Sequence, residues 1–399
     1  MNQMLKQKFP ILQHTLRGKR LVYLDSASTS QKPFSVIRAV SHYYEQYNAN
    51  TRRGVYRIAE KSTQAYEEAR ARVAGFIGAQ KAQVIFTKNA TEGLNLAAYA
   101  WGEQHIKNGD IVAVTQMEHH SNFLPWQRLC RNKKAELRVI PIDDQGRLML
   151  KDIKDARIKI ACVSHLSNVL GTINDVARIK SMLPKQAVLV VDAAQSLGHI
   201  PVDVSAFGCD FLAGSSHKAY GPMGSGFLYC SARVLNEMEP FELGGGMIAQ
   251  YFEKKNEWAE PPYKFEAGTQ DVAGAVGFAE ALAFIAKIWL SAIRVHEETL
   301  TGFLLEELLK DKDITVYGPI DGRGPVVSFC VRGIHGHDLA QVCSAYNVCI
   351  RAGHHCAMPL HEKLGVAATA RASFGIYNTK EDVEILLKAI VRAKKIFYL

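Results

Sequence analysis

Short apolar runs that alternate with helical patterns between residues 84 and 230 constrain the fold of this chain more than any other feature. Each run is rich in Val, Ile, Leu, Phe or Ala, and its length suits a strand rather than a helix. Nearly continuous apolar strands separated by helices are typical of a mainly parallel sheet that is covered on both faces. We therefore predict an α/β fold with a mainly parallel seven-stranded sheet and flanking helices. The expected strands lie near residues 84–86, 111–114, 137–140, 158–163, 187–191, 211–213 and 226–229.

The chain has 399 residues, which is about twice the usual size of one domain. Beyond about residue 280 a long helical stretch is followed by shorter strands and helices, and this pattern indicates a smaller α+β unit. We assign residues 1–20 to an N-terminal arm that packs on this unit, 21–284 to a large domain and 285–399 to a small C-terminal domain.

Composition and charge exclude several classes of function. The polar N-terminus lacks the apolar core of a signal peptide, and the most membrane-like stretch, residues 273–292, is interrupted by Glu280 and Lys287. Eight cysteines without a secretory signal favour free thiols in a reducing cytoplasm. The formal charge of +9 is not arranged as a basic stripe with aromatic residues, so we expect no nucleic-acid partner and no membrane partner.

Two of the apolar runs end in residues that suit a pyridine cofactor. Asp192 follows the run at 187–191, where an ionised acid needs a cation such as a protonated pyridine nitrogen. A helix N-cap is the competing interpretation of Asp192. Lys218 follows Ser215 and His217, which can donate hydrogen bonds to a phosphate while the lysine amine forms a Schiff base.

Two further polar segments follow apolar runs. Residues 87–95 form a polar turn that opens a helix, and its free N–H groups could bind a phosphate with help from Thr91, although any capped helix looks similar. Residues 118–122 contain Glu118, His119 and His120, which could bind zinc. An imidazole that stacks on a planar cofactor and moves protons fits this segment better.

The segment around Cys356 is the most informative part of the sequence. Arg351 and the histidines of residues 353–355 give this cysteine an electropositive setting, which lowers a thiol pKa and favours a nucleophilic thiolate. Metal binding together with Cys349 or Cys343 is the alternative.

Arg371 lies in an apolar strand pattern, where a charged residue is unexpected. A guanidinium that faces the cleft could hold a substrate carboxylate through two hydrogen bonds. A structural salt bridge is the competing explanation.

Four segments together resemble the class V aminotransferase superfamily, whose members have PLP fold type I, and within it the group II, SUF-type cysteine desulfurases. The resemblance covers nearly the whole chain, and the cysteine segment separates the desulfurases from other class V members. The four segments are Asp192-Ala193-Ala194-Gln195, Ser215-Ser216-His217-Lys218, Phe265-Glu266-Ala267-Gly268-Thr269 and Arg351-Ala352-Gly353-His354-His355-Cys356-Ala357.

The resemblance implies a pyridoxal 5'-phosphate (PLP) cofactor and a role for each site residue. For the cofactor, these residues are Lys218 for covalent attachment, Asp192 at the pyridine nitrogen, Gln195 at the phenolic oxygen, His120 stacked on the ring as the acid of the reaction, Thr91, Ser215 and His217 at the phosphate, and Thr269 reaching that phosphate from a neighbouring subunit. For the substrate, they are Arg371, Asn168 and Arg351, with Cys356 as the residue that takes the sulfur.

The function that the resemblance implies is conversion of L-cysteine to L-alanine by a homodimer, with a persulfide on Cys356 that passes to an acceptor protein of the SUF iron–sulfur assembly system. L-selenocysteine is a further expected substrate. The chain departs from the family at residues 50–56, where Asn-Val-His-Arg-Gly-Val-His is common, and at residues 270–271, where Pro-Asn is common. These departures leave the core chemistry unchanged, and they affect the expected shape of the entrance and of the loops that cross the dimer interface.

Two alternative functions differ from this interpretation in the residues that they would use. Another class V aminotransferase or lyase would keep the lysine and leave Cys356 without a purpose. A metal-binding module without PLP would use the histidines and the cysteine, which are His119, His120, His354, His355 and Cys356.

Overall fold

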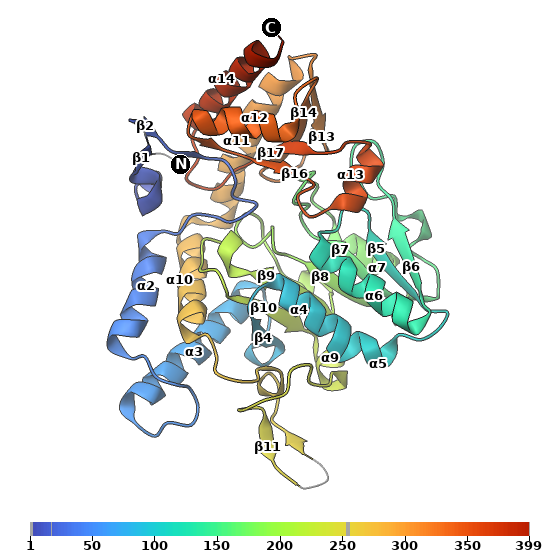
Figure 1. Ribbon diagram of the computed structural model, residues 1–399. Coiled ribbons are helices and arrows are strands. Elements are labelled where there is room, and N and C mark those ends of the chain that lie inside the picture. The colour runs from blue at the N-terminus through green and yellow to red at the C-terminus, as the bar shows by residue number, and fades with distance from the viewer. Residues whose placement is uncertain (1–2, 17, 253–255, 399) are drawn as a thin grey trace.

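A central seven-stranded sheet organises the first part of the protein in the computed structural model, which describes residues 3–16, 18–252 and 256–398 (Figure 1). The strand order is β4-β10-β9-β8-β7-β5-β6, and β10 is antiparallel to both of its neighbours while the other pairs are parallel. This confirms the predicted α/β fold. The strands are β4 (Val84–Thr87), β5 (Ile111–Thr115), β6 (Glu136–Ile140), β7 (Ile158–Ser164), β8 (Val188–Asp192), β9 (Phe211–Ser215) and β10 (Gly226–Cys230).

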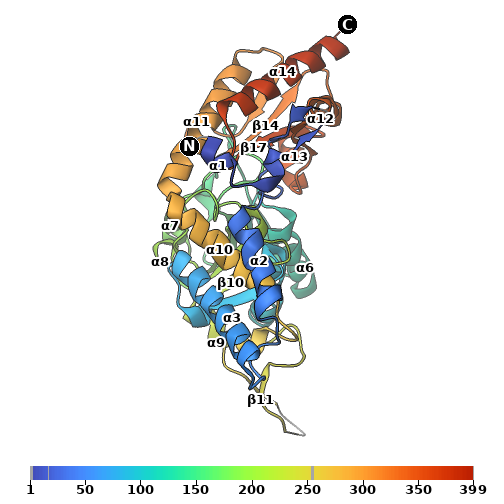
Figure 2. The same ribbon diagram turned by 90° about the vertical axis from the view of Figure 1, so that its left-hand side faces the viewer.

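Helices cover both faces of this sheet, and for this reason its inner strands are apolar throughout. Successive residues of a strand point to opposite faces. In β8, Leu189 and Val191 pack in one core with α3 (Arg57–Phe76), α7 (Val176–Met182) and α10 (Val272–Ile288). Val188 and Val190 pack in a second core with α4 (Ala90–Ala97) and α6 (Leu124–Lys133). Helices α2 (Phe34–Gln46) and α3 both pack against α10 (Figure 2).

The carboxyl ends of the parallel strands meet at one edge of the sheet. The register places Ser164 of β7 beside Asp192 of β8, and Asp192 beside Ala213 of β9. In open α/β sheets ligands bind beyond this edge. The polar residues that follow these strands are therefore brought together by the topology alone.

A second, four-stranded antiparallel sheet has the order β13-β14-β17-β16. Its strands are β13 (Ile314–Tyr317), β14 (Val326–Val331), β16 (Arg351–Gly353) and β17 (Thr369–Ser373). It shares a separate core with α11 (Leu290–Leu309), α12 (Gly336–Ala345) and α14 (Lys380–Phe397). We propose that this unit is the small domain, with its boundary near residue 285; the chain bends by 77° between α10 and α11.

One short strand in the C-terminal part of the chain pairs outside this sheet. β15 (Val348–Cys349) lies parallel to β3 (Val22–Tyr23) in a two-stranded sheet rather than in the sheet of β16 and β17. The remaining elements are α1 (Gln3–Lys6), β1 (Thr15–Leu16), β2 (Lys19–Arg20), α5 (Glu103–His105), α8 (Val204–Phe207), α9 (Ala232–Glu237), β11 (Ile248–Gln250), β12 (Glu257–Trp258) and α13 (Met358–Leu364).

The N-terminal segment contacts both parts of the protein. Phe9 is fully buried, and its ring packs 4.9 Å from that of Tyr377 and 5.8 Å from that of Phe284. Lys6 and Arg20 both form ion pairs with Asp382 of α14. We propose that residues 1–20 act as an arm on the small domain; within this range, residues 1, 2 and 17 lie outside the described part of the chain.

The predicted membrane-like stretch, residues 273–292, falls on α10 and the start of α11. Within the described residues, no single helix is long and apolar enough to cross a membrane, and the only pair that passes this test together is the bent pair of α10 and α11.

Candidate active site

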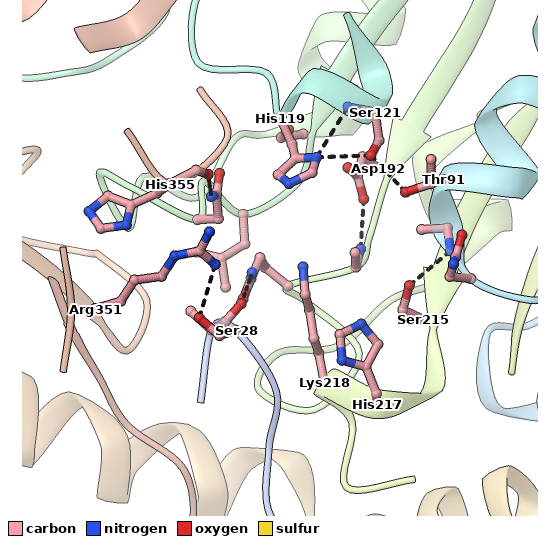
Figure 3. Close-up of a pocket in the computed structure, with 18 of the residues that line it drawn as sticks. Ser28, Thr91, His119, Ser121, Asp192, Ser215, His217, Lys218, Arg351 and His355 are labelled. Atoms are coloured by element: carbon pink, nitrogen blue, oxygen red, sulfur yellow. Dashed lines mark hydrogen bonds between the residues drawn. The ribbon is translucent and has the colours of Figure 1, made fainter. Parts of the chain in front are cut away.

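A cavity of about 200 Å³ lies where β7, β8 and β9 end, and it gathers most of the residues expected from the sequence. Figure 3 shows the Lys218 side chain between Arg351 and Ser28 on one side and His217, Ser215 and Thr91 on the other. The expected residues that line the cavity are Thr91, Asn168, Asp192, Gln195, Ser215, His217, Lys218, Arg351 and Arg371. Three expected residues, His120, Cys356 and Thr269, do not line it.

Lys218 ends the short helix η6 (Ser216–Lys218), which follows β9 directly. Burial lowers the pKa of its ammonium to about 8, while Asp192 acts to raise it and the positive charge of Arg371 lowers it further. An appreciable share of this amine is therefore unprotonated near neutral pH. Only the unprotonated amine can attack a carbonyl carbon.

Asp192 lies fully within the protein at the end of β8, and its Oδ1 accepts a hydrogen bond from the Ala194 N–H at 2.9 Å. Burial raises the pKa of this carboxyl, and the Ala194 N–H and the Lys218 charge both act to lower it. The helix N-cap interpretation is wrong, because the next helix in the described chain, α8, is capped by Asp203. Gln195 is buried nearby and donates to the Ala27 carbonyl at 2.8 Å.

The start of α4 forms one end of the cavity. The Ala90 N–H donates to the Ser215 Oγ at 2.8 Å, and the Thr91 and Ser121 hydroxyls lie 2.7 Å apart. His217 completes this end; burial lowers the pKa of its imidazole to about 4, so the ring is neutral. Its Nδ1 is buried without a hydrogen-bond partner among the described residues.

This arrangement fits PLP. A buried imidazole nitrogen without a partner, two hydroxyls and a helix N-terminus converge where a phosphate would lie. Across the same cavity a buried carboxylate, Asp192, is placed to hold a proton at a pyridine nitrogen, and Lys218 supplies the amine.

His119, and not His120, faces the cavity, which corrects the expectation from the sequence. Burial lowers the pKa of the His119 ring to about 3, with Lys218 as the next cause, and its Nδ1 accepts from the Ser121 N–H at 3.1 Å. His120 lies in a separate hollow, and its Nε2 accepts from the Met358 N–H at 3.1 Å. The short helix η4 (His120–Asn122) begins between the two histidines, and their ring planes are tilted by 50° with centroids 6.3 Å apart.

Two arginines occupy the opposite end of the cavity. Arg351 on β16 and Arg371 on β17 are direct partners in the strand register, and both line the cavity. Like charges placed directly opposite each other on paired strands repel. An anion bound between them would relieve this repulsion.

Arg371 is held firmly in place by its neighbours. Its Nη1 donates to the Asn168 carbonyl at 2.9 Å, and its Nη2 donates to the Ser28 hydroxyl at 2.9 Å and to the Asp25 carboxylate at 3.1 Å. The structural salt bridge that competed with a substrate role is therefore present, with Asp25 as its partner. Arg371 still has a buried Nε without a partner in the described chain, so the salt bridge leaves part of its guanidinium unsatisfied. Asp25 and Ser28 were not expected at this site from the sequence.

Cys356 borders this end of the cavity through Arg351, whose Nη2 lies 3.7 Å from the cysteine Sγ. The thiol is half-buried and belongs to a strained loop, because both His355 (φ 51°) and Cys356 (φ 59°) adopt the left-handed conformation. Asn168 supports the loop by donating to the His355 carbonyl at 2.7 Å. Among the described residues, no three His, Cys, Asp or Glu side chains are grouped so that they could hold a metal ion.

Thr269 lines a second hollow of about 280 Å³ together with Phe241 and Glu266. The two segments that depart from the family pattern meet beside it. Thr51 donates to the Gln270 side chain at 3.1 Å, and Arg52 pairs with Glu266 at 2.7 Å. The two departing segments are therefore in direct contact.

Comparisons with known proteins agree over nearly the full length. A family model described as aminotransferase class-V matches residues 22–386. A probable cysteine desulfurase from Halalkalibacterium halodurans is 43% identical over 98% of both chains, and a cysteine desulfurase from Haloferax volcanii is 42% identical over 98% of this chain and 97% of the other. An apo cysteine desulfurase structure from Thermococcus onnurineus NA1 has a TM-score of 0.92 at 38% identity, covering 99% of this chain and 98% of that one. The cysteine desulfurase CsdA from Escherichia coli also has a TM-score of 0.92, at 32% identity, covering 100% and 99%.

Proposed function

We propose a mechanism, residue by residue, for a chain that belongs to the class-V aminotransferase family and, within it, to the PLP-dependent cysteine desulfurases. The reaction converts L-cysteine to L-alanine, and the sulfur passes to an enzyme cysteine. The observation that carries the mechanism is the position of Arg351, which lines the cavity opposite Arg371 and places a guanidinium nitrogen 3.7 Å from the Cys356 Sγ.

The residues around Lys218 would bind the cofactor and transfer protons. PLP, when bound, supplies an electron sink for the carbanion that forms at the substrate Cα. Lys218 would attach the cofactor and, once the substrate amine replaces it, take the Cα proton; its lowered pKa suits both tasks. Asp192 would keep the pyridine nitrogen protonated, because a buried carboxylate favours a cation beside it. We propose that His119, rather than His120, stacks on the cofactor ring and relays protons, because His119 lines the cavity.

The arginine end orients the substrate. Arg371 and Arg351 would bind the substrate carboxylate, with Asn168 beside them. This fixes the Cβ–S bond on the side of Cys356. The Cys356 thiolate then forms a bond to the substrate sulfur while the Cβ–S bond breaks, and the electron pair of the broken bond stays on Cβ. Cβ and Cα each take up one proton as alanine forms. The product on the enzyme is a persulfide on Cys356.

We further propose that the protein acts as a homodimer in which Thr269 contacts the phosphate of the neighbouring subunit. Thr269 does not line the cavity of its own chain. Large apolar side chains are exposed in two segments that such a dimer could cover: Val55 and Tyr56 in one, and Leu243 and Tyr251 in the other.

The finer assignments follow from the same resemblance. We propose a group II, SUF-type desulfurase that passes sulfur to an acceptor protein for iron–sulfur cluster assembly and that also accepts L-selenocysteine. A cytoplasmic location is supported by the eight cysteines, all of which are free thiols in the structure.

The deciding experiment compares wild-type enzyme with Cys356→Ala and, as a matched control, with Cys349→Ala, another half-buried cysteine. Alanine and sulfide release from L-cysteine would be measured with a reductant present, and the absorption spectrum would report bound PLP. We expect three yellow proteins, of which only Cys356→Ala has lost turnover. Full turnover by Cys356→Ala would favour another class V lyase, and a wild type that PLP cannot reconstitute would refute the cofactor assignment.

A further inference from the structure

The loop that carries Cys356 needs an external support. Two consecutive residues without glycine's freedom, His355 and Cys356, have positive φ angles, and such conformations persist only where the surroundings hold them. The backbone receives part of this support, since the His120 N–H donates to the Cys356 carbonyl at 2.7 Å and Asn168 donates to the His355 carbonyl. The His355 side chain makes a further contact that supports the loop.

The His355 side chain forms a hydrogen bond with Thr369. This threonine begins β17, is fully buried, and lies directly opposite Gly353 in the strand register, at the base of the loop. Its hydroxyl lies 2.9 Å from the His355 Nε2 and 3.2 Å from the His361 Nε2. One hydroxyl group therefore joins the loop to α13, the helix that follows it.

The donor and acceptor in each hydrogen bond of this group can be assigned from one contact, that of His361 with a backbone carbonyl. The His361 Nδ1 lies 3.1 Å from the Ala357 carbonyl, which can only accept, so Nδ1 carries the proton. Burial lowers the pKa of His361, so the ring is neutral and its Nε2 must accept from the Thr369 hydroxyl. The Thr369 oxygen is then free to accept from the His355 Nε2–H. In the Thr369, His355 and His361 side chains, every polar atom except the His355 Nδ1, which is buried without a partner among the described residues, then has a complementary partner.

We propose that Thr369 is a positioning residue for Cys356, because its hydroxyl ties His355 to His361 and so holds the loop in the conformation that presents the thiol to Arg351. The inference rests on the proposed role of Cys356. Thr369 does not touch the substrate in this scheme, and it acts through the loop alone.

Thr369→Val tests this directly, since it replaces the hydroxyl with a methyl group of similar size, and Thr369→Ser is the matched control that keeps the hydroxyl. For Thr369→Val we expect kcat for alanine release to fall about tenfold, which corresponds to about 1.4 kcal/mol, while KM for L-cysteine and the PLP absorbance stay at wild-type values. We also expect Cys356 to react with iodoacetamide about threefold more slowly, because the thiolate loses its placement beside Arg351. Thr369→Ser should retain wild-type values in both assays.

Wild-type kcat and alkylation rate in Thr369→Val would overturn the proposal, as would equal losses in Thr369→Ser. If Thr369→Val does not fold, His361→Met removes the other end of the joint; a threefold or larger loss of alkylation rate is expected on the same grounds, and no loss would refute the idea. Failure of the proposed function would look different, because Cys356→Ala would then keep its turnover whatever Thr369→Val does.

Discussion

Replacing Lys218 with methionine should stabilise the cofactor-free protein at neutral pH. The pKa of this lysine falls from 10.5 to about 8 in the folded chain, and burial is the main cause. A difference of this size corresponds to about 3 kcal/mol, at about 1.4 kcal/mol for each tenfold change in the ionisation constant. Folding the ammonium form into the cavity therefore lowers the free energy of unfolding by up to that amount. Methionine occupies a similar volume without a charge.

The sign of the pH dependence follows from the two pKa values. Because the folded-state pKa lies below that of the unfolded chain, the cost is complete below the folded value of about 8 and disappears as the pH rises through 10.5. Two effects reduce the gain from the substitution: water in the cavity screens the charge, and Asp192 loses a cation that lowers its own pKa. We expect Lys218→Met to add about 1–3 kcal/mol at pH 7 and less than about 1 kcal/mol at pH 10.

Urea unfolding of the cofactor-free proteins, followed by circular dichroism at one protein concentration, would measure this difference. Lys388→Met is a suitable control, because Lys388 is exposed on α14 and its replacement should change stability by less than about 0.5 kcal/mol. The reasoning would be refuted if Lys218→Met were no more stable than the wild type at pH 7, or if its advantage were the same at pH 10.

Two further predictions concern the catalytic reaction. His119→Gln should lower kcat by about 10²-fold or more, as expected for the loss of a proton-transferring group, whereas His120→Gln should keep near wild-type activity; equal losses in a steady-state assay would contradict the placement of His119 in the cavity. Arg371→Lys should lower kcat/KM for L-cysteine by about 10–100-fold, mainly through KM, because an ammonium cannot replace a planar guanidinium that binds a carboxylate. An unchanged KM would contradict that role.

Much of the site was predictable because it lies at strand ends. Asp192 ends its buried strand, and Ser215 ends the next strand along the chain, two residues before His217 and three before Lys218. Parallel strands bring their carboxyl ends to one edge, so strand prediction and topology together placed these residues in one cavity. No knowledge of side-chain packing was needed for that step.

The choice between His119 and His120 depends on packing that no local pattern reveals. The preceding residue, Glu118, is buried and accepts hydrogen bonds from the Ser164 N–H and hydroxyl and from the Asn122 side chain, each at 2.6–2.7 Å. These contacts fix the turn that directs His119 inward. Two adjacent histidines have the same chemistry in the sequence, and only a partner from a distant strand distinguishes them.

The arginine end of the cavity also depends on distant segments. Arg371 is held by Ser28 and Asp25, which are more than 340 residues away in the chain. Its position opposite Arg351 follows from the register of β16 and β17, which short strands of three and five residues do not reveal in advance.

The charge distribution of the cavity links its stability to its ligands. Lys218, Arg351 and Arg371 line it against a single carboxylate, Asp192, and the lowered pKa values of His119 and His217 leave those rings neutral. Burial, with help from the neighbouring arginines, lowers the pKa of Lys218, which means that a positive charge on this lysine costs stability when no anion is bound beside it. A phosphate at one end and a carboxylate at the other would offset that cost. The stability gained by Lys218→Met without cofactor and the stability gained by the wild type on binding PLP should therefore share one origin, the buried positive charge of this cavity.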